Sequence, residues 1–247
     1  AVGYDAVANA RCTNAVANCG AGGTTLTYAL TVGAGSLRQL AVFTFVTCHV
    51  AGDAPAVSSV TYAGTTLTQQ ESLVPNAFRR GYLHSWPTGS QPTSGANDVV
   101  VTIDSNIYVT CVTGANSSIH GGAISVTGVD QTTIWTDTNQ NSGTSTSATL
   151  TLTGSGASDL GVHAVCAGSN LGATTETTRW TSDDENMSCN ADGGATAAAA
   201  DTSFSRTINS SDSWIMVGGA FKADAGGGGG TPGCRMLLLL GVGGTCS

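Results

Sequence analysis

Leu40-Ala-Val-Phe-Thr-Phe-Val-Thr-Cys48 is the longest alternating apolar stretch of the sequence, and it decides the fold class. β-branched and aromatic residues dominate it, and these residue types favour strands. Clusters of Gly, Asn, Asp, Ser and Pro, which favour turns, separate it from the shorter runs. The pattern therefore predicts an all-β protein built from many short strands. The shorter runs lie at 57–62, 99–103, 107–112, 123–127, 149–153, 160–166 and 214–221.

About a dozen strands are too many for one flat sheet, so we expect two face-packed sheets. The prediction is a two-sheet antiparallel β-sandwich of the jelly-roll, concanavalin-like type, spanning residues 1–224. Residues 225–233 contain five consecutive glycines and predict a flexible linker. Residues 234–247 form a separate apolar C-terminal segment.

The composition narrows the choice of partners. Eight Lys and Arg against sixteen Asp and Glu give the 247 residues a net charge of −8. Such a chain cannot neutralise many phosphates, so we expect no nucleic-acid partner. An apolar run of the roughly 18 residues that a spanning helix needs does not occur, so we expect no membrane span.

The cysteines predict an extracellular or cell-surface protein. Their number is even, and Cys-x-x-Cys, a common zinc-binding pattern, does not occur. The sequence begins at Ala1 without a cationic leader, which we interpret as a mature secreted chain. Proximity favours Cys12–Cys19, Cys166–Cys189 and Cys234–Cys246 as disulfides, and Cys48 and Cys111 are expected to bridge neighbouring strands, although sequence alone does not fix the connectivity.

Three stretches resemble a largely uncharacterised family of secreted or phage-associated bacterial β-sandwich domains. Val57-Ser-Ser-Val-Thr-Tyr-Ala-Gly-Thr-Thr-Leu-Thr68 is similar to the family's V-x-x-V-T-Y-x-G-x-x-L-T hairpin. Ala123-Ile-Ser-Val-Thr-Gly-Val-Asp-Gln131 and Trp214-Ile-Met-Val-Gly-Gly-Ala-Phe-Lys222 are similar to two of its strands. The resemblance covers residues 2–223 and implies a concanavalin-like jelly roll. It implies no catalytic residue.

No catalytic pattern stands out, and the sequence predicts a protein that is not an enzyme. The three glutamates, Glu71, Glu176 and Glu185, do not form the paired arrangement of a jelly-roll glycosidase. The serine-hydrolase elbow Gly-x-Ser-x-Gly is absent from the sequence. His163 has the opposite parity to its apolar neighbours, which predicts a partly exposed or hydrogen-bonded side chain. A hydrolase with an unrecognised site is the weakest alternative.

Two ligand types deserve consideration. Asp183-Asp184-Glu185 and Asp192 predict an acidic loop that could hold Ca²⁺, although no cofactor is required by any motif. Trp86, Trp135 and Trp180 lie near predicted loops or strand ends, and indole rings at such positions can stack on sugars. They are the candidate glycan contacts, and a packing role in the core is the alternative for each.

The C-terminal segment gives the sharpest clue to function. An exposed apolar run on a polar secreted protein would promote aggregation, so we expect it to be covered. It can fold back as a hairpin closed by Cys234–Cys246, or it can dock on a neighbouring subunit and build a homopolymer. The sequence thus predicts a non-enzymatic structural subunit of an extracellular filament or surface assembly. The alternative is a lectin-like adhesion domain that binds a polysaccharide. The apolar residues of the segment are Met236, Leu237, Leu238, Leu239, Leu240 and Val242.

Overall fold

A computed structural model describes residues 1–13, 23–48, 53–76, 78–111, 117–174, 176–184, 187–195 and 202–226. These residues form strands and one helical turn, α1 (Ile107–Thr110). The strands are β1 (Gly3–Thr13), β2 (Thr25–Val32), β3 (Gln39–Thr47), β4 (Val57–Tyr62), β5 (Thr65–Thr66), β6 (Thr68–Asn76), β7 (Arg79–Ser85), β8 (Gly95–Ile103), β9 (Ser118–Thr127), β10 (Trp135–Leu152), β11 (Leu160–Ala167), β12 (Leu171–Thr174), β13 (Thr177–Asp184), β14 (Met187–Ala195) and β15 (Thr202–Phe221).

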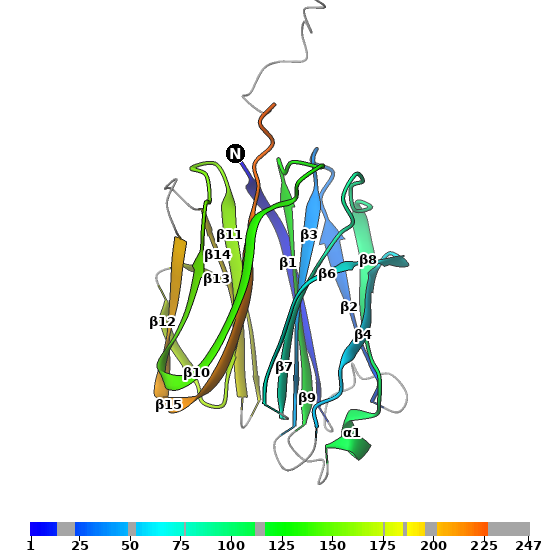
Figure 1. Cartoon of the computed structure of the whole chain (residues 1–247). Helices are drawn as coiled ribbons and strands as arrows, with labels where there is room; N and C mark the ends of the chain where they lie inside the picture. Colours follow the sequence, from blue (N-terminus) through cyan, green and yellow to red (C-terminus); the bar gives the residue numbers. More distant parts are fainter. Residues whose placement is uncertain are drawn as a thin grey trace, which may run out of the picture.

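The strands form three antiparallel sheets. The central sheet has the order β1-β9-β3-β7-β6, and the four-stranded sheet has the order β2-β8-β4-β5. The six-stranded sheet has the order β10-β15-β11-β14-β13, with β12 paired to β15. Figure 1 shows β2, β4 and β8 on one side of the central sheet and β10 to β15 on the other. The predicted antiparallel β-sandwich is confirmed, with three sheets in place of the expected two.

Strand β3 explains why a third sheet is needed. All nine of its residues are buried. Leu40 and Val42 pack into the core shared with the four-stranded sheet, whereas Phe43 and Phe45 pack into the core shared with the six-stranded sheet. Because successive side chains of a strand point to opposite faces, a strand that is apolar at both parities must be covered on both faces.

The long strands β10 and β15 bend back on themselves and add a further layer, the folded-back ribbon (147–152 and 202–208). Trp135 of β10 pairs with Phe221 and Leu152 pairs with Thr202, so the two strands stay paired through the bend. Figure 1 shows the bend at the foot of β10. A third core lies between the ribbon and the outer face of β11 and β15. This core contains Ala148, Leu150, Leu152, Val165, Ala167, Phe204, Ile208, Trp214, Met216 and Ala220.

Most of the strands predicted from the sequence are present in the structure. The strands expected at 40–48, 57–62, 99–103, 123–127, 149–153, 160–166 and 214–221 are all found, several of them longer than predicted. The strand expected at 107–112 is wrong. Ile107–Thr110 is a helical turn in which the Thr110 and Cys111 N–H groups donate to the carbonyls of Asn106 and Ile107. The preceding Asp-Ser-Asn favours a helix start over a strand.

The described residues pair as far as Ala223, through a bridge to Val129. Residues 227–247, which hold most of the predicted linker and the whole apolar segment, lie outside the described residues. Within the described ranges, no helix is long and apolar enough to cross a membrane.

Candidate functional site

A pocket of about 320 Å³ opens at one end of the sandwich, where the central and six-stranded sheets meet. It lies between the start of β6, the loop after β7 and the segment that leads into β10. Its lining residues are Thr68, Gln70, Trp86, Thr88, Thr132, Thr133, Ile134 and Trp135. Because β6 and β10 are the last strands of their sheets, the pocket lies along two sheet edges.

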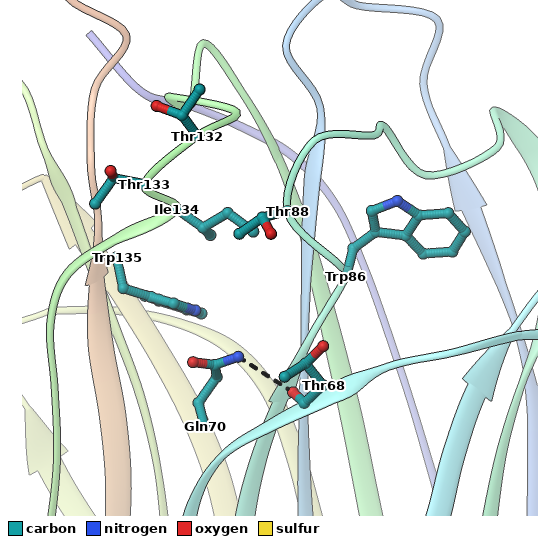
Figure 2. A pocket seen from close by; sticks show the side chains of 8 residues that line it. All are labelled: Thr68, Gln70, Trp86, Thr88, Thr132, Thr133, Ile134 and Trp135. Carbon is teal, nitrogen blue, oxygen red and sulfur yellow. Dashed lines mark hydrogen bonds between the residues drawn. The ribbon is translucent and has the colours of Figure 1, made fainter.

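Trp135 is the aromatic side chain that this pocket offers to a ligand. It is half-buried, and its ring stacks on Phe221 with centroids 4.1 Å apart and 21° between the planes. Its Nε1 donates to the Ser85 hydroxyl at 3.2 Å. A Cβ on Gly219 would lie 2.7 Å from the indole, so glycine is needed beneath it. Figure 2 shows the indole directed from β10 into the pocket, near the Gln70 amide.

Trp86 lines the same pocket but has a different role. It is 5% exposed, its Nε1 donates to the Ser90 hydroxyl at 3.0 Å, and its ring meets the Tyr62 ring edge-on at 6.1 Å. Figure 2 shows its indole turned away from the other lining side chains. Trp86 therefore anchors the pocket wall in the core.

Trp180, the third tryptophan predicted to contact a glycan, lies elsewhere. It is 4% exposed and packs between the sheets against Gly122 of β9. Its ring is a core side chain and is not available as a stacking surface. Trp180 therefore has the packing role that was the alternative to glycan contact, and most of the Trp86 ring has that role too.

A tight turn holds the two threonines of the pocket rim. The Asp130 carboxylate accepts hydrogen bonds from the Thr132 hydroxyl at 2.7 Å, the Thr132 N–H at 2.8 Å and the Thr133 N–H at 3.1 Å. These bonds, the Thr132 hydroxyl first, hold the pKa of Asp130 well below its usual range. Lys222 lies 3.1 Å from the same carboxylate. The rim is thus fixed before any ligand arrives.

Main-chain bonds fix the remaining wall. The Gly89 N–H donates to the Gln131 carbonyl at 2.8 Å, and the Lys222 N–H donates to the Ile134 carbonyl at 2.8 Å. The Gln70 amide nitrogen lies 3.4 Å from the Thr68 carbonyl oxygen. Thr68, Thr88, Thr132 and Thr133 are exposed, so their side chains remain accessible.

The lining carries no ionisable side chain, which decides its chemistry. One indole, one amide and exposed threonine hydroxyls suit a neutral, polyhydroxylated ligand, because a sugar offers an apolar ring face and hydroxyls that both donate and accept. Gln70, Thr88, Thr132 and Thr133 were not singled out from the sequence. The Asp-x-Thr-Thr spacing at 130–133 is typical of a turn capped by an aspartate side chain, and it could have indicated the position of Thr132 and Thr133.

The other candidate residues do not gather at this pocket. His84, His120 and His163 are buried, and none of them lines it. His163 has the predicted parity, but it is fully buried against the Phe204 ring, with centroids 4.6 Å apart. The prediction of partial exposure is wrong because the folded-back ribbon covers that face. His49 lies outside the described residues.

The predicted calcium loop does not form as a single loop. Asp183 and Asp184 end β13, where they pair with Ser188 and Met187. Asp192 lies within β14 opposite Thr178, several residues along the same hairpin. The three aspartates are therefore spread along the backbone of a hairpin, and Glu185 lies outside the described residues. In the part of the chain that is described, no three His, Cys, Asp or Glu residues cluster as metal ligands would.

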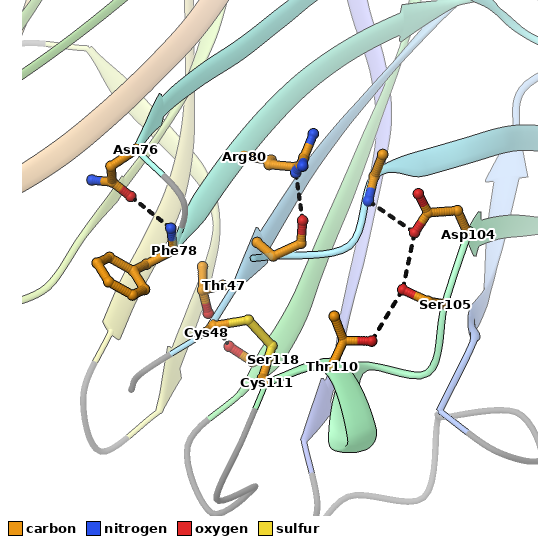
Figure 3. The surroundings of a disulfide bond; sticks show 12 residues. Thr47, Cys48, Asn76, Phe78, Arg80, Asp104, Ser105, Thr110, Cys111 and Ser118 are labelled. Carbon is orange, nitrogen blue, oxygen red and sulfur yellow. Dashed lines mark hydrogen bonds between the residues drawn. A yellow bond between two sulfur atoms is a disulfide. The ribbon is translucent and has the colours of Figure 1, made fainter. Parts of the chain in front are cut away.

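Two predicted disulfides are confirmed. Cys48 and Cys111 join the end of β3 to the residue after α1, with Cα atoms 5.2 Å apart. Figure 3 shows this bond beside α1 and the hairpin tip at Phe78, whose carbonyl accepts from the Cys48 N–H at 2.8 Å. Cys166 and Cys189 join the paired strands β11 and β14.

Three of the remaining cysteines and the whole apolar segment lie outside the described residues. Cys12 is also disulfide-bonded, and its predicted partner Cys19 lies outside the described residues. The predicted Cys234–Cys246 bond and the segment 236–242 fall outside them too.

No family model, curated protein or solved structure matches this chain.

Proposed function

We propose that this is a non-enzymatic extracellular protein that binds carbohydrate, with a neutral sugar unit seated against Trp135. The observation that carries the proposal is the uncharged lining of the pocket around a half-buried indole. Stacking on the indole removes the apolar face of a sugar from water, and the amide and hydroxyls exchange hydrogen bonds with its polar rim. The volume of about 320 Å³ matches a small-ligand cleft.

An extracellular setting is supported by the Cys48–Cys111 and Cys166–Cys189 bonds, because disulfides persist in oxidising compartments. Rigidity supports the binding role. The rim turn at Asp130 and the stack on Phe221 order the site in advance, so little conformational entropy is lost on binding.

Glycan-array screening followed by calorimetric titration of the best hit tests the proposal. Gln70→Ala removes the amide from the pocket, whereas Gln69→Ala changes an exposed neighbour that does not line it. We expect Gln70→Ala to weaken binding about tenfold and Gln69→Ala to leave it unchanged. Trp135→Ala should abolish binding, with circular dichroism confirming that the sheets persist. Equal binding by all four proteins would contradict the assignment.

A second candidate function is an assembly subunit, and the placement of two exposed apolar side chains favours it. Val74 and Phe78 are 47% and 42% exposed beside the β6–β7 turn, near Cys48 at the end of β3, which pairs with the start of β9. The chain leaves the sandwich at the other end of β9, where the Asp224 N–H donates to the Gly128 carbonyl. The two ends of β9, which has ten residues, lie about 30 Å apart. The exposed apolar side chains and the exit of the chain are therefore at opposite ends of the sandwich, an arrangement that suits head-to-tail contact between subunits.

Negative-stain electron microscopy tests this candidate with the full chain, a truncation after Asp224 and Phe78→Ser. Filaments or rings from the full chain alone would support docking of the segment 236–242 on a neighbour. Single particles from all three proteins would exclude it and favour a segment that folds back on its own subunit.

A further inference from the structure

The edges of two sheets run side by side from the Trp135 pocket. β6 ends the central sheet and β10 ends the six-stranded sheet. Past the pocket, the Thr138 hydroxyl of β10 donates to the Glu71 carboxylate of β6 at 2.6 Å. Further along, Asn76 of β6 and Ser142 of β10 line a second pocket together. The two strands therefore advance in step and form a seam with a pocket at each end.

The second pocket has a volume of about 200 Å³ and a different character, because Arg79 lines it. The guanidinium of Arg79 is half-buried and donates to the carbonyl and the hydroxyl of Ser213, which fix its direction. No carboxylate lines this pocket. Asp212, which lies close enough to interact with Arg79, offsets part of the positive charge.

The distance between the pockets sets the size of a ligand that would use both. Asn76 lies six positions beyond Gln70 on β6, which corresponds to about 20 Å along a strand. A monosaccharide in the Trp135 pocket cannot reach Arg79 across that distance, whereas an extended oligosaccharide of several units can.

We infer that the seam binds an extended acidic polysaccharide, with a sugar ring against Trp135 and a carboxylate of a more distant unit at Arg79. The inference rests on the proposed carbohydrate function and names the ligand class. A planar guanidinium held in one direction matches the two oxygens of a carboxylate. The exposed hydroxyl of Thr144 and the amide of Asn76 provide further hydrogen bonds beside it.

Glu71 follows Gln70 on β6, so its carboxylate lies on the seam close to the Trp135 pocket and adds a restriction. Its carboxylate would repel a negative group placed beside it, so the ligand is expected to carry its acidic group at the Arg79 end and a neutral unit near Trp135. Removing this charge with Glu71→Gln should therefore strengthen the binding of a chain that is acidic at every unit.

Calorimetric titration with matched oligosaccharides tests the inference. Galacturonate, alginate and hyaluronan hexasaccharides are compared with their carboxyl-reduced counterparts and with the disaccharides. For at least one sugar, the wild type should bind the acidic hexasaccharide about tenfold more tightly than the reduced form. This preference should vanish for the disaccharide and weaken in 1 M NaCl.

The variants separate the two claims. Arg79→Gln should remove the acidic preference, whereas Arg80→Gln, which changes a side chain bonded to the Ala54 carbonyl outside the pocket, should retain it. Trp135→Ala should abolish binding of acidic and reduced forms alike. If the wild type binds oligosaccharides without distinguishing acidic from reduced forms, or if Arg79→Gln keeps the preference, the inference is overturned and the proposed function stands. If no oligosaccharide binds, both fail.

Discussion

The side-chain amide of Asn141 donates to the main-chain carbonyl of Thr149 at 2.8 Å, across the bend of β10. Its Oδ1 also accepts from the Ser142 N–H at 2.9 Å. Asn139 repeats the arrangement, donating to the Thr151 carbonyl at 2.8 Å. These amides occupy the place of a neighbouring strand and join the two halves of β10. They satisfy edge groups that would otherwise invite pairing with another chain.

Asn141→Ala should therefore destabilise the folded-back ribbon by about 0.5–1.5 kcal/mol, because it removes the hydrogen bond that joins the two halves of β10. Thr149→Ala is a suitable control, since it keeps the carbonyl that accepts the bond and changes only an exposed side chain. Chemical denaturation would measure the free energies of unfolding of both variants. A cost for Asn141→Ala no larger than that of the control would contradict the role assigned to the amide.

Much of the sandwich follows from the sequence, and the ribbon shows where sequence reasoning ends. Residues 40–47 and 160–166 are largely apolar on both faces of an extended chain, a pattern typical of strands covered on both sides. Residues 138–147 are rich in Asn, Ser, Gly and Thr, which is typical of a loop, yet they lie within β10. Their strand conformation depends on side-chain bonds to residues beyond the bend, which no local pattern contains.

The candidate site shows the same limit. The sequence identified Trp135 but could not separate it from Trp180, because each tryptophan is followed by threonine within a polar stretch. Both lie on edge strands of the six-stranded sheet, and what distinguishes them is burial: Gly122 of β9 admits the Trp180 ring into the core, whereas Trp135 lines the open pocket. Burial of this kind depends on sheet order, which a single sequence does not specify.

The contact between Gly122 and Trp180 gives a second prediction. A Cβ on Gly122 would overlap the indole, so Gly122→Ala should cost about 1–3 kcal/mol through overpacking. Trp180→Leu removes the overlapping ring, and the double variant should lose less stability than the sum of the two single changes. Strict additivity in this double-mutant cycle would show that the two positions do not interact.

His84 predicts a dependence of stability on pH. Its side chain is 4% exposed, its Nδ1 has no hydrogen-bond partner in the described structure, and burial lowers its pKa to about 4. Because its pKa in the unfolded chain is about 6.5, the unfolded state binds the proton first as pH falls. The contribution to stability is full above pH 6.5 and declines towards pH 4, by about 3 kcal/mol in total.

Urea denaturation of the wild type and His84→Leu between pH 4 and 8 would measure this contribution. The difference between the two free energies of unfolding cancels the titration of other groups. We expect that difference to be constant above pH 6.5 and to change below it in favour of the variant. A difference independent of pH would exclude His84 as the source.

The two disulfides should contribute unequally. Cys48 and Cys111 are 63 residues apart, whereas Cys166 and Cys189 are 23 residues apart. Loop-closure entropy assigns about 4 kcal/mol to the first and about 3 kcal/mol to the second. Thermal melting of the Cys48→Ala/Cys111→Ala and Cys166→Ala/Cys189→Ala proteins should show the larger loss for the first pair. The reverse order would mean that native-state packing, not loop closure, dominates.

A sugar bound at Trp135 would change the environment of that indole, and the indole N–H resonances of the tryptophans report such a change residue by residue. A ¹⁵N-HSQC titration of the full chain with the best glycan from the array reports on each indole separately, with Trp135→Phe used to assign its peak. We expect a large, saturable shift of the Trp135 resonance and none for Trp180, which lies in the core away from both pockets. Saturable shifts that leave the Trp135 resonance unmoved would place the ligand elsewhere and exclude Trp135 as the sugar-binding residue.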